Sequence, residues 1–150
     1  MRHLWLLFAI GCGGGADGES LRGTVELQYG NDEPNLAVGA AIPNPENADD
    51  MVIVLGTNDI DCRTTLFDLD NTPPDGTFVL FSVDKQIEAS TPAVIVMEVA
   101  NMVETLDAGS GNVSITAIDE RVEGNVSFAT MDQTVGTIRV TGTFDVIRCF

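Results

Sequence analysis

The chain has 150 residues, 44% of them hydrophobic, and its 23 acidic residues outnumber its seven Lys and Arg residues to give a formal net charge of −16. This length suits one domain that buries its own core. Nucleic acids and anionic lipid surfaces are bound by clustered basic side chains, so the charge balance argues against both as partners. An acidic, self-repelling surface is typical of a soluble domain. Attraction of divalent cations or of a basic partner is the alternative explanation.

The first eleven residues have the organisation of an export signal. Arg2 and His3 precede the apolar run Leu4–Ile10, and small residues stand at Ala9 and Gly11. A basic start, an apolar core and small residues before a cleavage point are typical of a signal peptide. The run is too short to span a bilayer. We therefore predict that residues 1–11 are removed during export.

The segment Ala9-Ile10-Gly11-Cys12 resembles the lipobox of bacterial lipoproteins, although the commonest lipobox has leucine where Ala9 stands. In that family the signal is cut before the cysteine, and the cysteine then carries the lipid. The resemblance, which is confined to the N-terminal segment, implies lipid attachment at Cys12 and a membrane-anchored location in the bacterial cell envelope. Ordinary signal cleavage, with release of a soluble secreted protein, is the alternative.

Residues 12–21 are predicted to be a flexible tether, because the glycine-rich stretch after Cys12 has no apolar group to pack. A single β domain is predicted over residues 22–150. After removal of residues 1–11, 23 acidic residues stand against six basic ones, a formal charge of −17 for the mature chain.

Cysteine usage points to one disulfide. An odd number of cysteines in an exported protein indicates a special role for one of them. Lipid on Cys12 leaves Cys62 and Cys149, which we expect to pair in an oxidising compartment. Two separate buried thiols are the alternative. The disulfide would tie the middle of the chain to its last strand.

The first part of the domain is read as strands separated by turn residues. Alternating or continuous apolar runs predict strands over residues 23–29, 36–42, 51–55 and 77–83. The strand at 51–55 is apolar at every position, so we expect both of its faces to be covered. The apolar run Ala93–Val103 is compatible with a helix, but its β-branched residues favour one long central strand.

A short repeat organises the C-terminal part. Residues 111–115, Gly-Asn-Val-Ser-Ile, recur thirteen residues later as Gly-Asn-Val-Ser-Phe at 124–128. A unit of one strand and one turn favours an antiparallel meander, with a tight connection at Asp119-Glu120. Asn112 and Asn125 begin matches to the glycosylation acceptor pattern. In a bacterial lipoprotein we expect both to be unmodified strand residues.

The last strand is predicted over 136–147, with period-two alternation that places Ile138, Val140, Phe144 and Val146 on one face. Gly142 falls on the same face, where a glycine marks a bend or the close approach of another backbone. Seven or eight short strands with regularly spaced turns predict an all-β fold, an antiparallel β-sandwich or barrel.

Histidine chemistry is excluded from the mature chain, because His3 is the only histidine and lies in the signal. Two cysteines are too few for a structural zinc site. No nucleophile elbow, dinucleotide fingerprint or phosphate loop is present. We therefore predict a protein that is not an enzyme and carries no cofactor. A hydrolase with paired carboxylates is the alternative, although Tyr29 is the only Tyr or Trp of the mature chain that could stack on a sugar.

One acidic segment offers oxygen ligands for calcium. It runs from Asp59 to Asp75 and includes Asp68, Asp70 and Asn71. Hard cations prefer such oxygens, but Thr72 stands where an EF-hand would require a further ligand. We expect a solvated loop without a metal, and keep a calcium-dependent surface-binding module as the alternative. The first functional hypothesis is a lipid-anchored, non-enzymatic envelope protein that offers a sheet edge or a loop surface to a protein partner.

Overall fold

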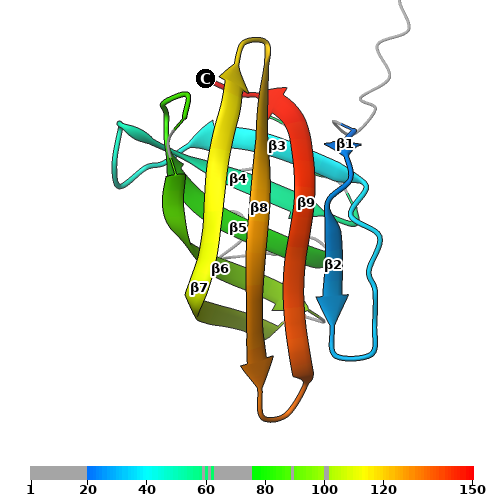
Figure 1. The fold of residues 1–150 in the computed structure, drawn as a ribbon. Coiled ribbons are helices and arrows are strands. Elements are labelled where there is room, and N and C mark those ends of the chain that lie inside the picture. The colour runs from blue at the N-terminus through cyan, green and yellow to red at the C-terminus, as the bar shows by residue number, and fades with distance from the viewer. Residues whose placement is uncertain (1–19, 59, 61, 63–75, 89, 100–101) are drawn as a thin grey trace, which may run out of the picture.

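All regular elements in the described part of the chain are β-strands (Figure 1). The computed structural model describes residues 20–58, 60, 62, 76–88, 90–99 and 102–150. The strands are β1 (Arg22–Gly23), β2 (Glu26–Tyr29), β3 (Val38–Pro43), β4 (Asp50–Gly56), β5 (Thr77–Asp84), β6 (Ser90–Val99), β7 (Met102–Ile118), β8 (Arg121–Asp132) and β9 (Gly136–Arg148). Within those residues, no helix of bilayer-spanning length and apolarity occurs. The predicted all-β class is confirmed.

The strand pairings form a circuit. From β3 to β9, each strand pairs antiparallel with the next one along the chain. A short parallel pairing of Ala40 with Ile147 and of Ala41 with Arg148 then joins β3 to β9. β1 and β2 pair antiparallel with β9 on the same edge as β3. The sheet is therefore mixed, whereas the sequence predicted a purely antiparallel one, because β3 and β9 run in the same direction where they meet.

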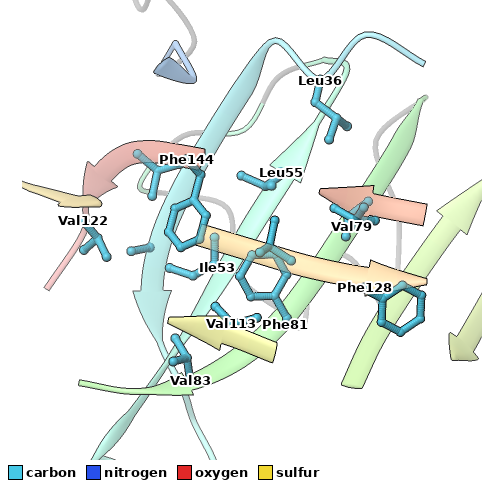
Figure 2. Close-up of a cluster of buried hydrophobic side chains, with 14 of the residues drawn as sticks. Leu36, Ile53, Leu55, Val79, Phe81, Val83, Val113, Val122, Phe128 and Phe144 are labelled. Atoms are coloured by element: carbon cyan, nitrogen blue, oxygen red, sulfur yellow. The ribbon is translucent and has the colours of Figure 1, made fainter. Parts of the chain in front are cut away.

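The circuit is flattened into two layers that enclose the main core. In Figure 1, β7, β8, β9 and β2 form the front layer, and β3 to β6 cross obliquely behind it. Phe81 on β5 and Phe144 on β9 meet across the layers edge to face, with ring centroids 5.6 Å apart (Figure 2). Such pairs contribute about 0.5 to 1.5 kcal/mol beyond their buried area. The two rings thereby hold the layers together.

A second apolar cluster lies on the outer face of β3, β4 and β5, the face that points away from the main core. It consists of Ala40, Ile42, Val52, Val54 and Phe78 together with Ile60. The strand at 51–55 is therefore buried on both faces, as its apolar run predicts, since Met51, Ile53 and Leu55 belong to the main core. The predicted Cys62–Cys149 disulfide is present beside this outer cluster, with 5.1 Å between the Cα atoms.

The two copies of the sequence repeat lie on β7 and β8 and pair with each other in a locally symmetric way. Asn112 lies opposite Ser127, and Ser114 lies opposite Asn125, so each Asn of one copy faces the Ser of the other. Between them, Val113 pairs with Val126, and both point into the core. The repeat thus encodes two strands that pair with each other through equivalent residues, with the expected tight turn at 119–120.

Two of the predicted strands are each divided in the structure. The run Ala93–Val103 is not one strand: β6 ends at Val99, β7 starts at Met102, and Glu98 pairs with Val103. Asn101 is the run's only residue of a type that favours turns, so apolarity alone did not mark the reversal. The strand predicted over 23–29 is divided into β1 and β2, since Gly23 adopts φ +115°.

Candidate functional site: a groove beside β2

The predicted lipid and calcium sites fall outside the described residues. Cys12 precedes the described residues, and the acidic segment is described only at Ile60 and Cys62. Both sites therefore stay predictions. The predicted tether, residues 12–21, is described at its last two residues, where Ser20 bridges to Val38 and the N–H of Leu21 donates to the carbonyl of Ala37, so these two residues belong to the folded domain. In the part of the chain that the structure does describe, no three His, Cys, Asp or Glu residues are grouped so that they could hold a metal ion.

The Cys62–Cys149 disulfide holds the C-terminus beside the outer apolar cluster on β3, β4 and β5. The backbone N–H of Cys149 also donates to the carbonyl of Ala41 on β3, at 2.9 Å. The following residue, Phe150, has the Lys85 ammonium 4.8 Å from its ring centroid. The same ammonium donates to the carbonyl of Ala48 at 2.8 Å. These contacts fix the chain end rather than forming a reactive site.

A groove of about 360 Å³ runs along β2. One wall is formed by β2 and β9, and the other by the segment that returns from β2 towards β3. The groove is lined by Val25, Glu26, Leu27, Gln28, Glu33, Pro34, Asn35, Leu36, Arg139 and Thr141. Its volume falls within the range of small-ligand sites.

Backbone hydrogen bonds close both ends of the groove. At one end, the N–H of Leu21 donates to the carbonyl of Ala37, at 3.0 Å. At the other, Tyr29 and Asp32 exchange two backbone bonds of 2.8 and 3.0 Å. Between these two points the chain segments are not paired with each other, which opens the groove.

The groove has two buried leucines at its base, but its accessible lining is mainly polar and includes charged side chains. Leu27 and Leu36 are only 2% and 8% exposed, and Figure 2 shows Leu36 at the margin of the main core cluster. Glu26 and Glu33 are exposed on opposite walls. Arg139 is exposed on β9, and the one ion pair found among the described residues lies elsewhere, between Arg121 and Asp145.

The edge of β2 that faces the groove has free main-chain groups. Thr24 donates to Thr143 at 2.9 Å and Gly30 donates to Thr137 at 2.8 Å. In an antiparallel pair, the residues bonded to the partner alternate with residues whose N–H and C=O face the other way. The even-numbered residues of β2 therefore bond to β9, and the N–H and C=O of Val25 and Leu27 face the groove. Within the described residues, no strand pairs with Val25 or Leu27 on this side.

No pattern in the sequence predicted this groove, although the sequence led us to expect that a sheet edge or a loop surface serves a protein partner. The sequence feature that could have indicated the groove is the run of turn residues at 30–34, which follows an amphipathic strand. Pro34 lacks an N–H and cannot continue a strand ladder beside β2. A strand followed by a turn and then a proline therefore leaves its outer edge unpaired, a consequence that becomes visible only with the topology.

The described residues form an all-β domain of two layers, with a disulfide that joins Cys62 to Cys149. The groove beside β2 has two exposed glutamates in its lining and an unpaired strand edge. No protein-family model matches the chain, and neither the curated proteins nor the solved structures include a significant match.

Proposed function

We propose that this protein is an exported, lipid-anchored, non-enzymatic binding module of the cell envelope, and that its partner binds in the groove beside β2. The observation that carries the binding function is the concave groove of about 360 Å³, whose mainly polar lining includes the charged side chains of Glu26, Glu33 and Arg139. Ligand sites are typically concave and use a few polar groups to fix the orientation of the ligand.

The location rests on two features. The Cys62–Cys149 disulfide indicates an oxidising, exported environment. The lipobox-like segment ending at Cys12 supports a lipid anchor. Durable membrane attachment needs more than one acyl chain or a second membrane contact. The anchor would hold the groove close to the membrane surface through a short tether.

The exposure of the groove carboxylates favours binding over catalysis. An acid catalyst that must stay protonated near neutral pH requires a carboxyl group in an apolar, buried setting. Glu26 and Glu33 are both exposed, so neither lies in such a setting. Charged carboxylates at the rim of a groove suit the recognition of a cationic group.

Mass spectrometry of the mature N-terminus from the native host tests the anchor. We expect a diacyl or triacyl modification on Cys12 and no residues from 1–11. A Cys12→Ser variant is the control and should lack the lipid mass. An unmodified Cys12 at the mature N-terminus would reject the lipid anchor and leave a soluble secreted protein.

Site-directed photo-crosslinking in intact cells tests the groove. A benzoylphenylalanine at position 35, on the groove wall, is compared with one at position 46, in the exposed loop between β3 and β4. We expect a discrete crosslinked product from position 35 and none from position 46. Absence of a product at position 35, or equal products from both positions, would contradict binding in the groove.

A further inference from the structure

We infer that the ligand of the groove is an extended, basic peptide segment of a protein partner, which adds to β2 as one more strand. This inference rests on the proposed function and specifies the chemistry of its partner. Strand addition is a common way of recognising extended peptides, with main-chain hydrogen bonds providing affinity and alternate side chains providing specificity.

The main chain of β2 supplies the first part of the argument. Val25 and Leu27 are two residues apart, so both present an N–H and a C=O along the same edge. Leu27 is 2% exposed and lines the groove, so its main-chain groups lie at the base of the groove and not on the open surface. Recessed backbone groups without a partner are costly, and a neighbouring extended chain would satisfy up to four of them.

The dimensions of the groove set the length of the added segment. The unpaired stretch lies between the Leu21–Ala37 bond and the Tyr29–Asp32 bonds. Five extended residues, such as Thr24–Gln28, span about 17 Å. The groove therefore accepts a short extended segment, and the closed ends exclude a long strand that would continue past Tyr29.

The charges on the two walls select a basic segment. An added strand would lie between Glu26 on β2 and Glu33 on the opposite wall, both exposed. Arg139, which pairs with Gln28 from β9, also lines the groove, so the lining carries two carboxylates against one guanidinium. Neighbouring strands are about 4.8 Å apart, so the backbone of Glu26 would lie nearer to the added strand than the backbone of Arg139. The net charge of −16 adds a long-range attraction for Lys and Arg side chains.

The test uses four capped pentapeptides against the mature protein: one of alternating Thr and Lys, one with Glu in place of each Lys, and two Thr-Lys peptides N-methylated on the odd or on the even residues. N-methylation removes donors from one edge without changing the peptide charge. Binding is followed by calorimetry and by backbone amide shifts of the protein.

We expect the Thr-Lys peptide to shift the amides of Val25 and Leu27, and the Glu peptide to bind at least tenfold more weakly. At least one of the two N-methylated peptides should lose about tenfold in affinity. The Glu26→Gln/Glu33→Gln variant should bind the Thr-Lys peptide several-fold more weakly. Glu46→Gln, which changes an exposed carboxylate outside the groove, is the matched control and should bind normally.

Three results would overturn the inference: no binding of the Thr-Lys peptide at millimolar concentration, equal binding of the Glu peptide, or unchanged binding of both N-methylated peptides. These results leave the crosslinking at position 35 as a separate measure of the proposed function. A groove that crosslinks a partner but fails the peptide tests binds a ligand other than an added basic strand.

Discussion

Arg121 on β8 forms an ion pair with Asp145 on β9, and the same guanidinium donates to the carbonyl of Ser20 at 3.0 Å. It also donates to the backbone carbonyl of Asp145 at 2.7 Å. Asp145 lies directly opposite Glu123 across the two strands, a like-charge pairing that destabilises a sheet unless a cation stands nearby. Arg121 thus compensates this pairing and fastens the first described residue of the domain to its last strand.

Replacing Arg121 with Met should lower the free energy of unfolding by about 2 kcal/mol, because a half-buried carboxylate and the Ser20 carbonyl lose their donor. Urea denaturation measures the change, and hydrogen exchange at residues 20–23 should become faster. Arg139→Met is the control, since Arg139 is exposed on the same strand as Asp145 and has no ion pair among the described residues. Equal destabilisation by both variants would contradict this role for Arg121.

The disulfide should be a main contributor to stability. Cys62 and Cys149 are 87 residues apart, and closing a loop of this length stabilises the folded state by about 4 to 5 kcal/mol on the chain-entropy model. The Cys62→Ser/Cys149→Ser variant should show a corresponding loss in urea denaturation, and a reductant should destabilise only the parent protein. Two reactive thiols in the denatured, unreduced protein would show that no disulfide had formed.

Gly142→Ala should destabilise the domain by more than 2 kcal/mol. Gly142 has φ +128°, and a Cβ there would collide with the backbone of Thr24 and Val25. Gly136→Ala is a matched control, because Gly136 also has positive φ, +96°, but a Cβ there would meet no atom within 4 Å. Backbone strain alone predicts similar losses of about 1 kcal/mol in both variants. A larger loss in Gly142→Ala identifies the close approach of the two chains as the cause.

Asp132 should make the stability pH-dependent in the acid range. The backbone N–H groups of Val135 and Thr134 donate to its carboxylate at 2.8 and 2.7 Å and lower the pKa of Asp132 below its usual value. The folded state therefore favours the ionised form. This contribution is complete above the ordinary pKa of about 3.9 and is lost as the pH falls through the lowered pKa of the folded state.

The Asp132→Asn variant tests this pH dependence, because its amide does not titrate. The parent protein should be more stable than the variant at pH 7, and the difference between their free energies of unfolding should shrink in strong acid. A difference that stays constant between neutral and strongly acidic pH would show that ionisation of Asp132 does not contribute.

Local sequence patterns determined the strands and their faces. Period-two alternation places Ile138, Val140, Phe144 and Val146 in the core because successive side chains of a strand point to opposite faces. The continuous apolar run at 51–55 predicts burial on both sides for the same reason, and cysteine counting predicts the disulfide. These features depend on side-chain chemistry over a few neighbouring residues, which the sequence displays directly.

Only the tertiary structure decided which strand edges are paired. The parallel contact of Ala40 with Ile147 joins strands more than a hundred residues apart, and the reversal inside Ala93–Val103 depends on which strands can pair with each other. Strands pair through backbone N–H and C=O groups, which are nearly the same in every residue. The periodicity of the side chains therefore says little about which strand pairs with a given strand edge. The groove beside β2 is the main consequence, because its open edge at Val25 and Leu27 follows from where the chain goes after Pro34.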